Sequence, residues 1–104
     1  MTFDYVDIVK QIVLKQVPND AFAIFLFGSR TAGNAKALSD IDIGILGTEP
    51  LPMIVKAHLD ADLDEGIVPF KIDLIDFYQV DKDFKKEALK KIQIWNCPKN
   101  IKLN

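Results

Sequence analysis

The chain has 104 residues, 49% of them hydrophobic and 27% charged, a length and composition that fit a single compact domain spanning residues 1–104. Its 15 acidic residues outnumber its 13 lysines and arginines, which gives a formal net charge of −2 at pH 7. Without a long basic block, the chain is not expected to bind a nucleic-acid backbone strongly on its own.

Cysteine content and hydropathy indicate which cellular compartment suits the chain. Cys97 is the only cysteine, so an internal disulfide is excluded and a reducing environment is suitable. No uninterrupted apolar run approaches the ~20 residues that cross a bilayer. Asp4 and Asp7 near the start argue against a signal peptide. The sequence therefore predicts a cytoplasmic protein that is not embedded in a membrane.

The hydrophobic pattern divides the chain into helical and strand-like segments. Apolar residues spaced three and four apart predict helices, and short apolar or alternating runs predict strands. In chain order, the expected elements are a helix at 3–17, strands at 22–27 and 40–46, a helix at 51–63, a strand at 70–77 and a helix at 81–95. This order predicts a small α+β domain.

Two aspartates interrupt the otherwise apolar strand predicted at residues 40–46. Asp40 and Asp42 are two residues apart, so their side chains lie on one face of the strand, roughly 6–7 Å apart along it. Neighbouring carboxylates resist ionisation together, and a bound Mg²⁺ or Mn²⁺ ion, which takes oxygen ligands, relieves their repulsion. The pair therefore predicts a divalent metal site.

The next predicted strand offers a third carboxylate. Asp73 and Asp76 are both candidates, but Ile72 and Leu74 mark the core side of this strand, and Asp73 points away from that side. Asp40, Asp42 and Asp73 together could hold two metal ions about 3.5–4 Å apart. This arrangement stabilises the attacking and leaving oxygens in phosphoryl or nucleotidyl transfer.

Gly28 and Ser29 follow the first predicted strand and suit a phosphate group. A glycine lets the backbone approach a phosphate closely, and the serine hydroxyl and the following amides can donate hydrogen bonds to it. Arg30 either adds positive charge beside the phosphate or pairs with an aspartate to fix the loop. Asn34-Ala35 stands where a P-loop requires lysine followed by serine or threonine, so a P-loop is excluded.

The spacing of these residues resembles a known signature. From Gly28-Ser29, ten residues lead to Asp40-Ile41-Asp42, as in the DNA polymerase beta-type nucleotidyltransferase superfamily. The longer string GSRTAGNAKALSDIDIGIL is similar to its minimal nucleotidyltransferase (MNT) branch. The resemblance implies the nucleotidyltransferase fold, here a small mixed sheet of three or four strands with helices packed on one face.

The same resemblance implies roles for the candidate site residues. Asp40, Asp42 and Asp73 would be catalytic and would ligate two Mg²⁺ ions, while Gly28 and Ser29 would hold a nucleoside triphosphate. A hydroxyl would attack the α-phosphorus of ATP, and pyrophosphate would leave.

The acceptor of the nucleotide is expected on another protein. Small MNT proteins resemble the antitoxin half of toxin–antitoxin modules, whose other half is an all-helical HEPN-type protein encoded nearby. The resemblance implies AMP transfer to a tyrosine of that partner, because 104 residues leave no length for a separate acceptor-binding domain. The main alternative is an inactive antitoxin that neutralises its partner by contact alone; transfer to a small molecule is a third option.

Several features stay open at the level of sequence. His58 is predicted to pack partly buried on its helix rather than to act in catalysis. Ser39 either caps a turn or contacts the nucleotide. Trp95 is either a core aromatic or an anchor for a partner helix. The sequence leaves open which nucleotide is preferred and whether the chain forms a homo-oligomer.

Overall fold

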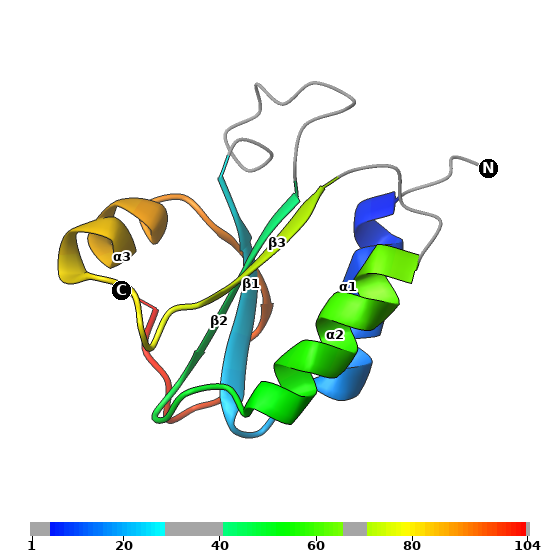
Figure 1. Ribbon diagram of the computed structural model, residues 1–104. Coiled ribbons are helices and arrows are strands. Elements are labelled where there is room, and N and C mark those ends of the chain that lie inside the picture. Colours follow the sequence, from blue (N-terminus) through cyan, green and yellow to red (C-terminus); the bar gives the residue numbers. More distant parts are fainter. Residues whose placement is uncertain (1–4, 29–40, 66–70, 104) are drawn as a thin grey trace.

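The computed structural model describes residues 5–28, 41–65 and 71–103 (Figure 1). In chain order the elements are α1 (Tyr5–Gln16), β1 (Phe22–Phe27), β2 (Ile41–Gly47), α2 (Met53–Glu65), β3 (Ile72–Asp76), α3 (Lys82–Ala88) and β4 (Gln93–Asn96). The predicted α+β class is confirmed. Among the helices in the described part of the chain, none has the length and apolar content that a bilayer crossing requires.

The strands form one mixed four-stranded sheet in the order β3-β2-β1-β4. β1 is antiparallel to both β2 and β4, whereas β2 and β3 are parallel. Parallel strands need a crossover between them, and α2 lies in that connection. The starts of β2 and β3 therefore lie at the same end of the sheet as the end of β1.

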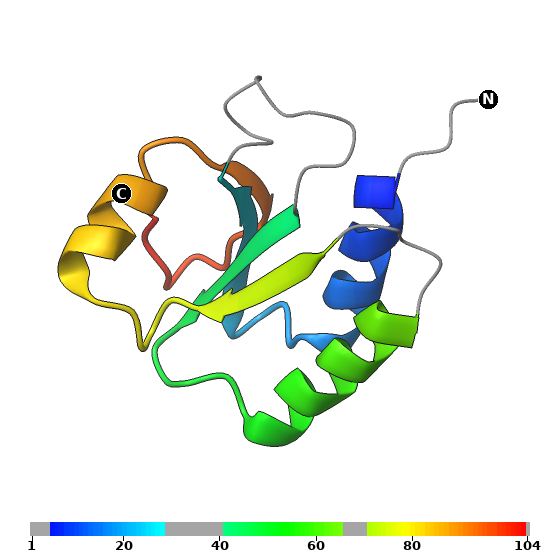
Figure 2. The same cartoon turned by 45° about the horizontal axis from the view of Figure 1, so that its top comes forward.

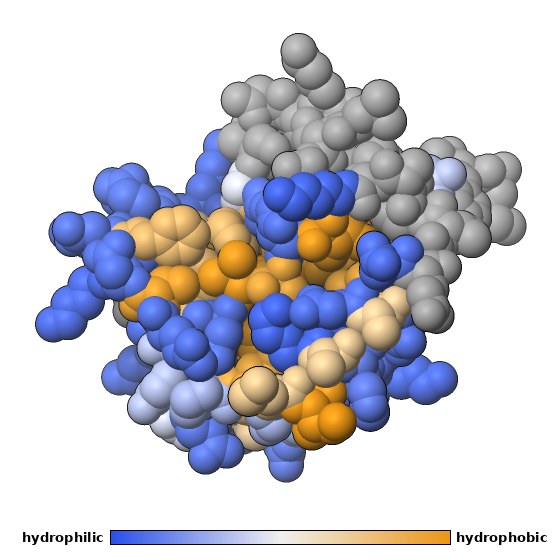
Figure 3. Space-filling view, in the orientation of Figure 1, coloured by the Kyte–Doolittle hydropathy of each residue, from blue (hydrophilic) through white to orange (hydrophobic). Residues whose placement is uncertain are grey.

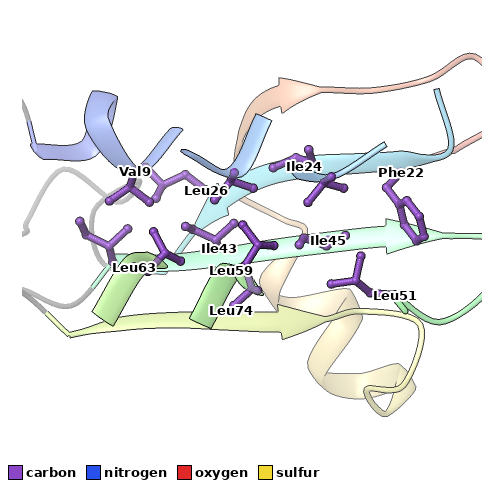
Figure 4. Close-up of a cluster of buried hydrophobic side chains, with 13 residues drawn as sticks. Val9, Phe22, Ile24, Leu26, Ile43, Ile45, Leu51, Leu59, Leu63 and Leu74 are labelled. Carbon is purple, nitrogen blue, oxygen red and sulfur yellow. The ribbon is translucent and has the colours of Figure 1, made fainter. Parts of the chain in front are cut away.

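Helices α1 and α2 cover one face of the sheet (Figures 1 and 2). Their apolar side chains meet those of the strands in a single layer, shown in Figure 4. We call this layer the helix-side core; it consists of Val9, Val13, Val17, Phe22, Ile24, Leu26, Ile41, Ile43, Ile45, Leu51, Leu59, Leu63 and Leu74. Burial of this layer fixes which side chains of each strand face the helices.

The opposite face of the sheet is also covered, so the expectation of helices on one face holds for α1 and α2 only. A second apolar cluster, the α3-side core, lies there; it consists of Ala23, Phe25, Phe27, Leu46, Phe77, Ile101 and Leu103. Ala88 of α3 and the neighbouring Leu89 pack against it. The reason is β1, whose six residues are all buried and therefore need partners on both faces.

The helix predicted at residues 81–95 is wrong in its second half. α3 ends at Ala88, and Trp95 lies in β4, which pairs with the second edge of β1. The Asn96 side chain donates hydrogen bonds to the Asn19 and Phe22 carbonyl oxygens, at 2.7 and 2.9 Å. Trp95 is partly buried against the helix-side core, which favours its role as a core aromatic. Pairing with a distant strand thus overrides local helical spacing.

Gly44 makes room for the aromatic rings of the α3-side core. A Cβ atom at this position would lie 2.2 Å from Phe25 Cε2 and 2.8 Å from Phe77 Cε1. The two rings meet edge to face, with centroids 4.9 Å apart, in the space that a side chain would occupy. The absence of a side chain at Gly44 is therefore a condition for this packing.

We expect Gly44→Ala to lower the free energy of unfolding by about 1–3 kcal/mol, because the added methyl group overpacks a filled core. Urea denaturation of the unmodified chain and of Gly44→Ala measures the change in the free energy of unfolding. Combining Gly44→Ala with Phe25→Leu removes the nearest ring atoms, so the double variant should lose less stability than the sum of the single ones. An unchanged urea midpoint for Gly44→Ala would contradict this account of the packing.

Candidate active site

Two carboxylates lie side by side at one end of the sheet. Asp42 of β2 and Asp73 of β3 are direct partners in the parallel ladder, and Phe27 of β1 is the partner of Asp42 on its other side. Paired residues on adjacent strands, about 4.8 Å apart, project to the same face. That face is the one opposite α1 and α2, so both carboxylates lie outside the helix-side core.

The environment of the pair leaves it partly open to solvent. Asp42 is partly buried, and the Asp73 side chain is 37% exposed. Lys71 Nζ lies 3.8 Å from Asp73 Oδ1, but the lysine side chain is 71% exposed, so this ion pair contributes little. Like charges directly opposite each other in a sheet are destabilising. The direct opposition of Asp42 and Asp73 by itself therefore opposes folding.

Gly28 approaches the Asp42 carboxylate at the end of β1. Its φ angle of +86° is one that residues with a side chain rarely adopt. A Cβ atom built at Gly28 would lie 2.3 Å from Asp42 Oδ2. Both the backbone conformation and the close approach of the Asp42 carboxylate therefore require glycine at this position.

Asp76, the other acidic residue of β3, supports the fold by accepting backbone hydrogen bonds. Its Oδ2 accepts a hydrogen bond from the Leu51 amide at 2.9 Å, and its Oδ1 accepts one from the Tyr78 amide at 3.0 Å. These bonds tie the end of β3 to the segment that precedes α2. Asp73, by contrast, is the residue that β3 places next to Asp42.

Several predicted site residues lie outside the described part of the chain: Ser29, Arg30, Ser39 and Asp40. Within residues 5–28, 41–65 and 71–103, no group of three or more histidine, cysteine or acidic side chains is close enough to hold a metal ion. The structure thus describes two of the three predicted carboxylates, and Asp40 directly precedes β2 in the sequence. His58 is exposed on α2, so the prediction that it packs partly buried is wrong.

The described residues fit a divalent cation. Carboxylate oxygens are the ligands that Mg²⁺ and Mn²⁺ take, and Asp42 and Asp73 present theirs from neighbouring strands on one face. The Asp42 carboxylate lies where a side chain at position 28 would stand, so Gly28 is what brings the end of β1 close to this carboxylate. An acidic pair with a glycine backbone close beside it suits a metal-bound phosphate.

Comparison with known proteins assigns the chain to a family. The family model "Polymerase beta, Nucleotidyltransferase" matches residues 9–99. The chain belongs to this nucleotidyltransferase family. It is 34% identical over 87 residues to a Haemophilus influenzae protein with the name Probable protein adenylyltransferase MntA, covering 84% of this chain and 74% of the relative. The chain is therefore a nucleotidyltransferase.

Solved structures share the nucleotidyltransferase fold. A crystal structure of a toxin–antitoxin with AMP-PNP matches with a TM-score of 0.71 and 21% identity, covering 92% of this chain and 76% of the other. A structure of the tri-AMPylated Shewanella oneidensis HEPN toxin in complex with its MNT antitoxin matches with a TM-score of 0.60 and 20% identity, covering 86% and 70%. The predicted fold is thereby confirmed.

Asp73 and Asp76 are expected to differ in their effect on stability. Asp76→Ala removes the acceptor of two backbone amides and should lower the free energy of unfolding by about 1–3 kcal/mol. Asp73→Ala removes a like charge beside Asp42 and should lower the free energy of unfolding by no more than about 0.5 kcal/mol. Relief of the repulsion can even raise it. Urea denaturation in the presence of a chelator measures both. An equal loss in the two variants would mean that Asp73 supports the fold instead.

Proposed function

We propose that this nucleotidyltransferase is a protein adenylyltransferase that transfers AMP from ATP to a hydroxyl group of a HEPN-type partner protein. The observation that carries the proposal is the pairing of Asp42 with Asp73 beside the Gly28 backbone. The partner and the nucleotide are suggested by relatives: one bears the name protein adenylyltransferase, and another is an MNT antitoxin in complex with an AMPylated HEPN toxin. The exposed free Cys97 fits a reducing cytoplasm as the compartment.

We assign the metal ligands to the acidic residues of the predicted motif. Asp42 and Asp73, together with Asp40, would hold two Mg²⁺ ions, for which Mn²⁺ is an alternative. Bound Mg²⁺ would supply positive charge to the oxygens around the α-phosphorus. The contribution of the chain is to fix two carboxylates on adjacent strands, so that their positions are set by the sheet rather than by a loop.

We assign triphosphate binding to residues 28–30, the first part of the motif. Gly28, with Ser29 and Arg30, would bind the triphosphate, because the glycine brings the end of β1 close to the Asp42 carboxylate. A toxin–antitoxin with AMP-PNP among the structural neighbours supports ATP as the substrate. In the reaction, the acceptor hydroxyl would lose its proton to solvent, its oxygen would form a bond to the α-phosphorus, the bond from that phosphorus to the oxygen bridging to the β-phosphorus would break, and pyrophosphate would leave. Holding the two reactants in line lowers the entropic part of the barrier.

The acceptor is proposed to be a tyrosine of the HEPN-type partner. We expect the chain, incubated with Mg²⁺, labelled ATP and the HEPN-type protein encoded beside it, to attach AMP covalently to that protein. Asp42→Asn should reduce the transfer by at least about 100-fold, since it removes a carboxylate from the paired site. Asp64→Asn, a change of the same kind at an exposed position on α2, is the matched control and should keep full activity. Mass spectrometry of the partner measures the modification and its site.

Two outcomes would contradict this proposal. The first is the absence of transfer when both proteins are folded and bound to each other. The second is transfer that Asp42→Asn leaves unchanged. Neutralisation of the partner is a separate readout, because an Asp40→Ala/Asp42→Ala variant that still neutralises it fully would show that contact alone is sufficient.

Gly28→Ala is expected to weaken metal binding by at least about 10-fold, because the added methyl group displaces the Asp42 carboxylate and φ is positive. Titration with Mn²⁺, monitored by electron paramagnetic resonance, measures the affinity of each variant for the ion. Gly47→Ala is the control, since a Cβ there would lie 2.5 Å from Phe22 Cδ1 at the far end of β2. It should lose stability but keep its Mn²⁺ affinity; an unchanged affinity in Gly28→Ala would overturn the placement of the metal beside Asp42.

A further inference from the structure

The phenylalanine of α3 is half-exposed on the sheet face that carries the carboxylates. Phe84 of α3 is 44% exposed, whereas the other phenylalanines of the described residues, Phe22, Phe25, Phe27 and Phe77, are at most 7% exposed. Its neighbours on α3 are mostly charged. Figure 3 shows hydrophobic surface on the α3 side of the molecule among hydrophilic side chains. Met53, Ile54, Tyr78 and Ile94 are more exposed than Phe84, so the position of its ring beside Phe27, and not its exposure alone, distinguishes it.

Phe84 is connected to the acidic pair through ring contacts. Its ring centroid lies 6.2 Å from that of Phe27 and 5.7 Å from that of Phe77. Phe27 directly precedes Gly28 and is the cross-strand partner of Asp42. The half-exposed ring is therefore one side chain away from the end of β1 where the proposed triphosphate site begins.

The rings beneath Phe84 hold it in place. Phe27 and Phe77 meet edge to face with centroids 5.1 Å apart, and Phe84 meets Phe27 at an interplanar angle of 89°. Asp81 caps the start of α3 by accepting a hydrogen bond from the Asp83 amide at 2.8 Å. A rigid aromatic ring with an open surface can stack on a planar ligand at a low cost in conformational entropy.

We propose that Phe84 stacks on the base of the bound nucleoside triphosphate and so binds the end of the nucleotide that Gly28 and the carboxylates do not. This inference rests on the proposed function. The base and the triphosphate are opposite ends of one ligand, and the chain offers an apolar ring and an acidic, metal-binding pair on the same face of the sheet. Stacking on a phenylalanine does not read base edges, so ATP should be preferred over other nucleotides only weakly.

The test compares ATP with inorganic tripolyphosphate, which has the phosphates but no base. With Mg²⁺ present, calorimetric titration of the full chain should show that Phe84→Ala weakens ATP binding by about 5- to 150-fold. The affinity for tripolyphosphate should stay the same. Phe84→Leu, which keeps apolar bulk for packing, should weaken ATP binding in the same direction, and Phe84→Trp should preserve it.

Met53→Ala is the matched control. Met53 is another exposed apolar residue, at 88% exposure, and it starts α2, beyond the end of β2 that lies away from Asp42. Its substitution should change neither affinity. Thermal unfolding of every variant shows whether the protein remains folded at the titration temperature.

The results separate a failure of the stacking site from a failure of the proposed function. The stacking site is overturned if Phe84→Leu binds ATP like the unmodified chain, or if Phe84→Ala and Phe84→Leu lose ATP and tripolyphosphate affinity equally. In either case the phosphate and metal site stands. An unmodified chain that binds neither ligand would overturn the proposed function together with the stacking site.

Discussion

The parallel pairing of β2 with β3 is the constraint on which the rest of the site depends. Its register places Asp42 opposite Asp73. Because side chains alternate between the two faces of a sheet, a slip of one residue would turn one aspartate toward the helix-side core. Burial of an unpaired carboxylate there is strongly unfavourable. The packing of Ile43 and Leu74 under α1 and α2 therefore determines where the acidic pair lies.

β1 connects the two faces of the molecule. All of its residues are buried, so α1 and α2 cover one side while α3 and the C-terminal segment cover the other. On the second side, Phe27 directly precedes Gly28 in the chain, and its ring contacts that of Phe84. The same strand that completes the core thus carries the backbone of the proposed phosphate site and supports the ring assigned to the base.

The site gathers features that folding by itself does not favour. Asp42 and Asp73 are like charges in direct opposition, Gly28 has a positive φ angle, and Phe84 is half-exposed. The like-charge pair contrasts with the all-apolar helix-side core, and the positive φ angle at position 28 requires glycine. Asp42, Asp73 and Gly28 lie together at one end of the sheet, a concentration that is typical of a functional site.

The sequence by itself determined the α+β class and, through its alternation, the face of β3 on which Asp73 lies, because these depend on local periodicity and burial. It did not predict the end of α3 at Ala88 or the strand β4 at Gln93–Asn96, because the spacing of Phe84 and Trp95 also suits a helix. Only the tertiary structure decided that segment, since the unpaired edge of β1 supplies hydrogen bonds that no local pattern encodes. Likewise, the alternation placed Asp42 and Asp73 on faces, but only the parallel register made them neighbours.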